Sequence, residues 1–373
     1  MHKKISILLL ICFYLFTGLT YASDLPNIEA SSCILMDIDS GRILYSKNIN
    51  EKRAMASTTK IMTAIIALEL GNIEDLVTIS ENSAGTEGSS IWLESGEILT
   101  LEELLYGLML NSGNDAAVAI AEHIGGSVEG FTKLMNDKAK EIGAVNTNFA
   151  NPHGLHDDKH YTTAYDLALI TRYALLNTDF KKIVSTTRKT IPWFGKEWDR
   201  QLYNRNKLLW QLEGADGVKT GYTKKAGRCL VASATRNDQH LLSVVLSSPS
   251  IFEESKRLLE YGFNNYTNHE ILKNENPIKT VEIKGGDKNF ISIYPERNIK
   301  IPIKDYEKDK ITILIQTPDT VTAPLKKGQT IGTVKVMLNN DLVGISPLII
   351  KEDVNEQKNL YKLINNIFLK LFK

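Results

Sequence analysis

Residues 57–70 read STTKIMTAIIALEL and open with Ser57 and, three positions later, Lys60. Apolar residues recur at steps of three and four between Ile61 and Leu68, and a glycine follows the stretch as a stop. This pattern predicts a helix over residues 57–70. Because side chains at i and i+3 lie on one face of a helix, the hydroxyl and the amine are expected within reach of each other.

This spacing gives Ser57 a plausible base. A serine is a poor nucleophile until a neighbouring group removes its proton. Lys60 can do so only when it is neutral, a state favoured by burial and by a second nearby cation. The helix N-terminus adds partial positive charge that helps to hold a developing oxyanion. Taken alone, the motif occurs by chance in a chain of this length, and the alternative is a capping serine beside a surface lysine.

A second motif, Ser112-Gly113-Asn114, lies between two predicted helices. The hydroxyl there can relay a proton to a leaving amine, and the amide can hold a substrate peptide group. Residues 80–82, Ser-Glu-Asn, fit the same pattern. We favour Ser112 because it occupies a tight connection after the apolar helix predicted at 101–110, whereas Ser80 lies in a polar stretch.

A third motif, Lys219-Thr220-Gly221, occurs once, on a predicted strand. A cation and a hydroxyl side by side can bind a carboxylate. Glycine allows a substrate backbone to run along the strand edge. The alternative is an edge strand with ordinary polar residues.

The elements around these motifs predict an α+β fold in which one antiparallel sheet is covered by helices. The expected helices are 57–70, 101–110, 115–124, 131–142, 165–176 and 253–261, and the expected strands are 33–39, 42–46, 217–220, 228–235 and 241–247. From about 279 to 350 the pattern is all strand, with Gly, Pro and Asp turns, which predicts a second, small all-β domain. We therefore expect a catalytic domain over 23–270 and a β-rich domain over 275–350.

Both chain ends carry their own signals. Two lysines precede an apolar run and a small-residue boundary at Ala22, the pattern of a secretory signal peptide over residues 1–22; the alternative is a retained membrane anchor. Residues 354–373 place an apolar stripe beside lysines, which predicts an amphipathic helix lying on an anionic membrane surface. The alternative for this helix is docking onto the protein itself.

Composition narrows the class of protein further. Lys+Arg and Asp+Glu are both 44 in 373 residues, so the net charge is zero and nothing indicates a nucleic-acid partner. After removal of the signal, Cys33 and Cys229 remain, each in an apolar, strand-like stretch. They are expected as buried free thiols rather than as a disulfide framework.

The three motifs occur in the order described for serine penicillin-recognising enzymes. On that basis the chain resembles the low-molecular-mass penicillin-binding proteins of the peptidase S11 family, which act as D-alanyl-D-alanine carboxypeptidases. The resemblance extends from about residue 27 to the C-terminus, and its strongest stretches are 54–60, 111–117, 151–155 and 216–221. It implies a β-lactamase/transpeptidase-like catalytic domain, a C-terminal β domain and an amphipathic tail.

The resemblance also implies catalytic roles. Ser57 attacks the carbonyl between two D-alanines and forms an acyl-enzyme that water hydrolyses. Lys60 is the implied base, and Ser112 and Lys219 pass protons or tune charge.

The same resemblance implies a set of binding roles. Asn114 holds the peptide, and Thr220, helped by Arg205, binds the terminal carboxylate. The backbone N–H groups of Ser57 and Tyr222 form the oxyanion hole. Some relatives have histidine at the position of Tyr222, a change that preserves the backbone donor.

The implied partners are peptidoglycan stem peptides, β-lactam antibiotics as inhibitors, and the outer face of the cytoplasmic membrane. No cofactor and no metal are implied, and no nucleic acid is expected.

Three alternatives stay open. A class A β-lactamase shares the motifs but normally has a glutamate where the stretch 173–177 has Tyr173. A zinc peptidase is suggested by three histidines and two aspartates, His153, His156, Asp157, Asp158 and His160, although their context reads as a loop rather than a ligand helix. A non-catalytic wall-binding scaffold would use the β domain as its partner surface.

Overall fold

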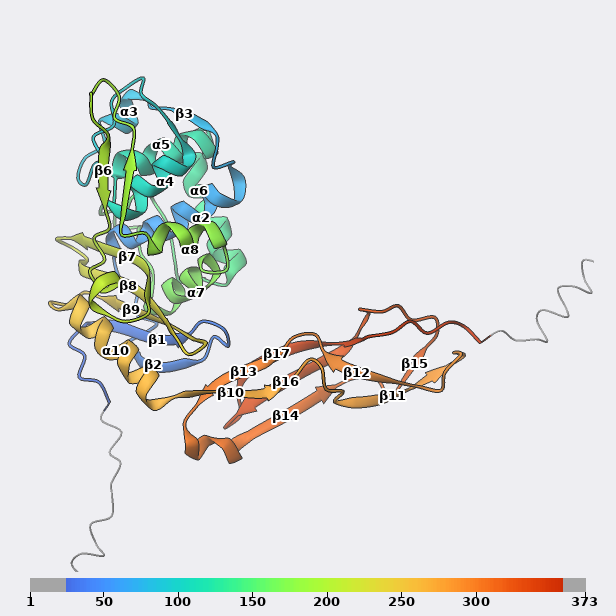
Figure 1. The fold of residues 1–373 in the computed structure, drawn as a ribbon. Coiled ribbons are helices and arrows are strands. Elements are labelled where there is room, and N and C mark those ends of the chain that lie inside the picture. The colour runs from blue at the N-terminus through green and yellow to red at the C-terminus, as the bar shows by residue number, and fades with distance from the viewer. Residues whose placement is uncertain (1–24, 358–373) are drawn as a thin grey trace, which may run out of the picture.

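The computed structural model describes residues 25–357, which form a helix-rich domain and an elongated all-β domain (Figure 1). The expected signal peptide, residues 1–22, lies outside the described residues, as do residues 358–373. Within the described range, no helix is both long and apolar enough to cross a bilayer.

The helix-rich domain contains a five-stranded sheet whose neighbouring strands all run antiparallel. In spatial order its strands are β2 (Ile43–Lys47), β1 (Ser32–Asp37), β9 (Gln239–Leu246), β8 (Gly227–Arg236) and β7 (Ala215–Thr223). Strand β7 is therefore an edge of this sheet. The predicted hairpin and the three later strands are confirmed, with ends that differ by a few residues.

The central strands are buried on both faces. Along β1, Ile34 and Met36 pack into the core beneath the main helices, and Cys33 and Leu35 pack into a second core on the other face. This two-sided burial explains why the strands appear in the sequence as continuous apolar runs. Cys229 points into the first core, so the two thiols lie on opposite faces and both are free, as expected.

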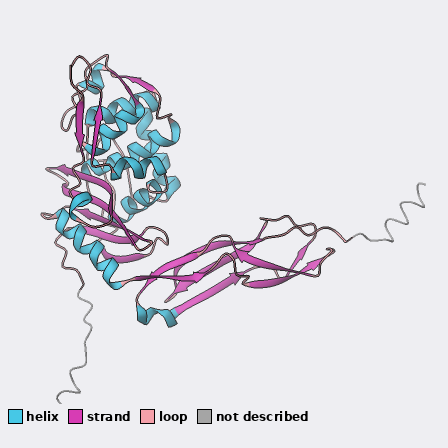
Figure 2. Ribbon diagram, in the orientation of Figure 1, coloured by secondary structure: helices cyan, strands magenta, loops and turns pink. Residues whose placement is uncertain are grey.

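Helices cover both faces of the sheet (Figure 2). The larger layer holds η1 (Ala56–Thr59), α2 (Lys60–Leu70), α4 (Leu101–Leu110), α5 (Asn114–Gly125), α6 (Val128–Ile142), α7 (Ala164–Ala174) and α8 (Thr178–Ser185), and α10 (Ile251–Asn265) covers the other face. Helix α2 is buried along its whole length up to Ala67 and contacts α4, α5, α6, α7 and α8. It is thus the central helix of the domain, and the predicted α+β class is confirmed.

Short elements complete this domain. They are the paired strands β3 (Leu76–Thr78) and β4 (Ile98–Thr100), the hairpin of β5 (Arg188–Ile191) and β6 (Arg200–Tyr203), and the single-turn helices α3 (Glu81–Ala84) and α9 (Leu208–Gln211). None of them was expected from the sequence.

The second domain is built from strands, as the sequence predicts, with one short 3-10 helix, η2 (Asp305–Lys310). Strands β10 (Thr267–Leu272) and β13 (Ile299–Ile303) pair with each other. A six-stranded sheet follows in the order β14 (Ile311–Gln316), β16 (Thr330–Leu338), β17 (Asp341–Ile350), β12 (Phe290–Pro295), β11 (Lys279–Lys284) and β15 (Thr320–Thr322). Because β10 pairs with β13, the strands of this domain begin at Thr267.

The start of the predicted terminal helix, at residue 354, requires a correction. Val354 forms an antiparallel bridge with Leu325, and Glu356 forms one with Gly286. Backbone pairing to the β domain holds these residues in an extended arrangement, so residues 354–356 belong to that domain. The remainder of the expected helix, residues 358–373, lies outside the described residues.

Candidate active site

Ser57 lies in the 3-10 turn η1, directly before helix α2. The sequence predicts one continuous helix from 57, but the α-helical hydrogen bonding begins only at Lys60. Thr58 Oγ1 donates to the carbonyl oxygen of Met55 (2.6 Å), and Thr59 Oγ1 donates to that of Ala56 (2.8 Å). These local bonds compete with helical ones and fix the tight turn that presents the serine.

Lys60 is fully buried, and its amine lies among three oxygen atoms. The Nζ atom is 2.7 Å from Asn114 Oδ1, 2.6 Å from the carbonyl oxygen of His153 and 3.1 Å from Ser57 Oγ. Burial, the nearby charge of Lys219 and that of Arg205 lower the pKa of Lys60 well below its ordinary value. A neutral amine has two N–H groups and one lone pair. Two of the three oxygens accept only, so the lone pair is left for the hydroxyl of Ser57.

The side-chain orientation of Asn114 is fixed because both the oxygen and the nitrogen of its amide form hydrogen bonds. Its Nδ2 donates to the carbonyl oxygen of Glu87 at 2.6 Å, which turns Oδ1 toward Lys60. Asn114 begins α5, and Ser112 sits just before it, buried, with a positive φ of 66°. The competing Ser80 is placed differently: it caps α3 and donates to Glu122 Oε2 at 2.6 Å.

Strand β7 brings the third motif to the same place. Lys219 is buried, and burial together with the charge of Arg205 lowers its pKa to about 7. Its Nζ donates to the carbonyl oxygen of Thr220 (3.0 Å). Gly221 faces the turn η1, because a Cβ built on it would lie 2.9 Å from the backbone nitrogen of Ser57. The neighbouring Tyr222 directs its side chain into solvent.

Arg205 is held by two buried neighbours. Asn204 Nδ2 donates to the carbonyl oxygens of Val184 and Thr186, and Asn206 Nδ2 donates to that of Gly217 at 2.6 Å. The side chain of Arg205 is exposed, and its guanidinium donates to Ser89 Oγ at 3.4 Å. Its charge contributes to the lowering of the pKa values of both Lys60 and Lys219.

The three histidines of the alternative zinc site do not converge. His160 accepts from the backbone N–H of Ala150 through Nδ1, so its Nε2 carries the proton and donates to Thr59 Oγ1 at 2.7 Å. His153 likewise accepts through Nδ1, from Leu155. Burial lowers their pKa values to about 4 and about 3, so both are neutral. In residues 25–357 no three His, Cys, Asp or Glu side chains are grouped to hold a metal ion.

Sequence reasoning missed Asp115, a buried residue beside the second motif. Its carboxylate accepts from Ser90 Oγ (2.5 Å) and from the backbone N–H groups of Ile91 and Leu93 (3.0 and 3.2 Å). Asp115 therefore attaches the loop before β4 to the start of α5. Asp115 lies inside the stretch 111–117 that carries the family resemblance, and this position was the only feature of the sequence that could have indicated its role.

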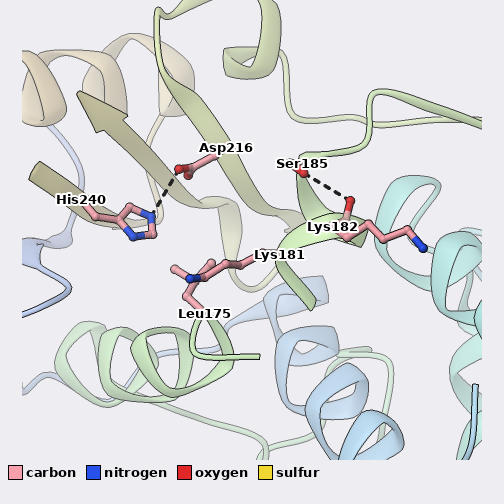
Figure 3. A pocket seen from close by; sticks show the side chains of 6 residues that line it. All are labelled: Leu175, Lys181, Lys182, Ser185, Asp216 and His240. Atoms are coloured by element: carbon pink, nitrogen blue, oxygen red, sulfur yellow. Dashed lines mark hydrogen bonds and ion pairs between the residues drawn. The ribbon is translucent and has the colours of Figure 1, made fainter. Parts of the chain in front are cut away.

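A small cavity of about 140 Å³ lies between α8, the end of α7 and strands β7 and β9, and no residue of the three motifs lines it (Figure 3). It is lined by Leu175, Lys181, Lys182, Ser185, Asp216 and His240. Asp216 accepts from Ser233 Oγ (2.5 Å) and Thr235 Oγ1 (2.6 Å), and His240 Nε2 lies 3.4 Å from it. These contacts anchor the start of the strand that carries Lys219.

A serine hydroxyl beside a buried amine, with an asparagine amide and the Lys-Thr-Gly edge strand facing them, is the arrangement of a serine acyl-transfer enzyme. Residues 20–250 match the family described as D-alanyl-D-alanine carboxypeptidase, Peptidase S11, and residues 266–356 match the C-terminal domain of penicillin-binding protein 5.

Individual relatives extend over most of the chain. The D-alanyl-D-alanine carboxypeptidase DacF of Bacillus subtilis is 38% identical over 339 residues, which cover 88% of this chain and 86% of the relative. DacC of Escherichia coli is 36% identical over 364 residues, 92% and 90% of the two chains. The crystal structure of penicillin binding protein 5 from Haemophilus influenzae superposes with a TM-score of 0.75 at 34% identity, covering 89% of this chain and 99% of that one.

The chain therefore belongs to the Peptidase S11 family of D-alanyl-D-alanine carboxypeptidases. This finding confirms the resemblance stated from the three motifs, together with the penicillin-binding-protein fold and the C-terminal β domain.

Proposed function

We propose that the chain is a serine D-alanyl-D-alanine carboxypeptidase that removes the terminal D-alanine from peptidoglycan stem pentapeptides. The observation that carries the proposal is the buried amine of Lys60, whose Nζ lies 2.7 Å from Asn114 Oδ1, 2.6 Å from the carbonyl oxygen of His153 and 3.1 Å from Ser57 Oγ. Family membership supplies the substrate class.

In the acylation step, the lone pair of Lys60 takes the proton of Ser57 Oγ, and the oxygen attacks the carbonyl between the two D-alanines. Negative charge develops on the carbonyl oxygen, where the backbone N–H groups of Ser57 and Tyr222 receive it. The C–N bond then breaks, and the leaving amine takes a proton delivered through Ser112 and Lys219. Water hydrolyses the resulting ester and restores Ser57.

Substrate binding follows from the free edge of β7. Within residues 25–357 the strand pairs only with β8, so its other edge offers backbone groups to an extended peptide. The peptide amide meets Asn114, and the terminal carboxylate meets Thr220 and Arg205. Gly221 keeps this edge open to a backbone.

The proposal includes a location outside the cytoplasm, at the outer face of the cytoplasmic membrane. The signal pattern of residues 1–22 supports export, and the apolar stripe from Leu360 to Phe372 supports tethering to the membrane surface. In this proposal the β domain lifts the catalytic domain away from that surface.

The test incubates the mature protein with a fluorescent penicillin and with a peptide ending in D-Ala-D-Ala, beside a Ser57→Ala variant. We expect stable labelling and D-alanine release, both lost in the variant. Rapid penicillin turnover without D-alanine release would instead favour a β-lactamase, although Tyr173 occupies its glutamate position and donates to Glu69. If the folded protein gives neither signal, the remaining interpretation is a non-catalytic wall-binding scaffold.

A further inference from the structure

Three large aromatic side chains of the helix-rich domain are exposed to solvent. Trp92 is 70% exposed, Trp198 is 63% exposed and Phe194 is 54% exposed. Trp92 comes from the loop before β4, and the other two come from the tip of the β5–β6 hairpin. We call these three residues the aromatic rim. Exposed aromatic groups gathered in one place mark binding surfaces more often than they contribute to folding.

A buried ion pair joins the two segments that carry the rim. The guanidinium of Arg200 bonds Glu97 twice, at 3.0 and 3.2 Å, and both side chains are almost wholly buried. The same group donates to the carbonyl oxygen of Trp92 and to that of Pro192, each at 3.1 Å. The loop and the hairpin tip are therefore fixed against each other, and the rim is a built surface.

Trp92 also adopts an unfavourable backbone conformation. Its φ is 62°, in the left-handed region that a bulky side chain rarely occupies. Its N–H donates to Ser90 Oγ at 2.7 Å, and the N–H groups of its neighbours Ile91 and Leu93 donate to Asp115 beside the second motif. The fold thus holds a tryptophan in strain in order to present it to solvent, which is typical of a functional position.

The exposed face of β6 connects the rim to the active site. Burial alternates along this segment, so Gln201, Tyr203 and Arg205 share the exposed face, and Asn206, which follows Arg205, bonds Gly217 of β7. Arg205 lies five positions after Arg200, a distance of about 17 Å along an extended segment. Four stem-peptide residues upstream of the scissile bond span at most about 14 Å. The base of the rim therefore lies about one stem-peptide length from Arg205, so a sugar attached to that peptide can reach it.

We propose that the aromatic rim binds the N-acetylated hexopyranose rings of the peptidoglycan glycan strand, an inference that rests on the proposed carboxypeptidase function. Aromatic faces are electron-rich and pack against the C–H groups on the face of a pyranose ring. Lys196, Glu197 and Asp199 are exposed at the same tip and offer polar partners to sugar hydroxyl and amide groups. The enzyme then discriminates glycan-linked stem peptides from free ones.

The test compares two substrates that end in D-Ala-D-Ala, a free stem peptide and the same peptide linked to its disaccharide. The variants are Trp92→Ala, Trp198→Ala and the double variant. The control is Trp210→Ala, which removes a tryptophan that is also 55% exposed but lies in α9, away from the rim. We expect kcat/KM for the linked substrate to fall about tenfold in the double variant. Hydrolysis of the free peptide and penicillin labelling should match the wild type.

A second measurement uses glycan strands stripped of peptide, added to the Ser57→Ala protein while tryptophan fluorescence is followed. We expect a saturable change in fluorescence on addition of glycan. The double rim variant should lose this change, and the Trp210→Ala variant should retain it. Equal losses on both substrates, no loss on either, or no binding of peptide-free glycan would overturn the inference and favour a protein partner for this surface. If the wild type releases no D-alanine from the free peptide, the proposed function fails. The glycan titration then still shows whether the aromatic rim binds glycan.

Discussion

Asn114 Oδ1 lies 2.7 Å from Lys60 Nζ, and the amide cannot turn away because its Nδ2 donates to Glu87. A neutral oxygen at this point accepts an N–H of the amine without favouring its protonation as a carboxylate would. We expect Asn114→Asp to raise the pKa of Lys60 and so keep the amine protonated at neutral pH.

The predicted result is a loss of penicillin acylation of about tenfold or more at pH 7, since one pKa unit corresponds to a tenfold change in the neutral fraction. The ascending limb of the pH–rate profile should move to higher pH, with partial recovery in alkaline buffer. Asn114→Ala is the control, because it removes the same bond and adds no charge. It should slow acylation without moving the limb upward. A profile for Asn114→Asp that matches Asn114→Ala would contradict the role of charge.

We expect Lys219 to give the descending limb of the pH–rate profile. Its pKa is lowered to about 7 by burial and by Arg205, so it carries its charge below that pH and loses it above. We expect kcat/KM for a substrate with a free terminal carboxylate to fall as the pH rises through about 7. In Arg205→Ala the cationic neighbour is gone, so the limb should shift to higher pH while KM rises.

Arg205→Lys keeps the charge and serves as the matched variant for this shift. It should leave the descending limb near its wild-type position even if KM changes. A limb that stays in place in Arg205→Ala would show that another group controls it. The measurement is a series of initial rates between pH 5 and pH 9.

Much of the fold could be predicted because its strongest signals are local. Strands β1, β8 and β9 are buried on both faces and read as apolar runs, and α4 has its capping box and apolar spacing in the sequence itself. The β5–β6 hairpin was missed because its strands, RKTI and RQLY, are rich in charged and polar residues. Its stability comes from Arg200 and Glu97, whose pairing spans 103 positions.

The site was predicted as motifs, but its geometry could not be. The serine turn departs from a regular helix because Gly154 and Gly221 bring two distant segments against residues 56–58. The orientation of Asn114 depends on a carbonyl 27 positions away, at Glu87. Contacts of this kind have no periodicity, so no pattern in the sequence indicates them.

Gly221 provides a direct test of this close packing. A Cβ at that position would lie 2.9 Å from Ser57 N and 3.1 Å from Thr58 N, both of which are backbone atoms. Gly221→Ala should displace the turn by a fraction of an ångström and slow penicillin acylation by about 10- to 100-fold, since misplacement of this kind is costly to catalysis. Thermal unfolding should change little. Acylation at the wild-type rate would mean that the turn tolerates the displacement.

Substitutions at Gly154 and Gly143 separate the effect of backbone strain from that of a steric clash. Gly154 and Gly143 both have a φ of 89°, so alanine strains the backbone equally at the two positions, by about 1–2 kcal/mol. Around Gly143 there is no heavy atom within 4 Å of the added Cβ, whereas at Gly154 the Cβ would overlap the carbonyl oxygen of Ala56. Gly154→Ala should therefore lower the free energy of unfolding more than Gly143→Ala and should also slow acylation. Equal effects of the two substitutions in chemical denaturation would refute the proposed collision.

Arg42 joins the two domains. Its guanidinium donates to Glu307 Oε1 at 2.7 Å and to the carbonyl oxygen of Pro302, and it lies 5.3 Å from the ring centre of Tyr266. Burial acts to raise the pKa of Glu307, but Arg42 and the N–H of Lys304 outweigh it, so the pKa is lowered overall. A carboxyl whose pKa is lower in the folded state stabilises the fold above its unfolded pKa. That contribution disappears as the pH falls through the folded value.

Arg42→Met leaves the carboxylate of Glu307 without its main partner and should cost about 3 kcal/mol of unfolding free energy at pH 7. The double variant Arg42→Met with Glu307→Gln should be less destabilised than the sum of the two single variants, because the pair interacts directly. Acidification should erode the stability of the wild type more than that of Arg42→Met, since only the wild type has this stabilisation to lose. Hydrolysis of a short D-Ala-D-Ala peptide should be unchanged in every variant, because none of these groups contacts Ser57 or Lys219. Additive single effects in denaturant titrations at pH 7 would show that the ion pair does not couple the domains.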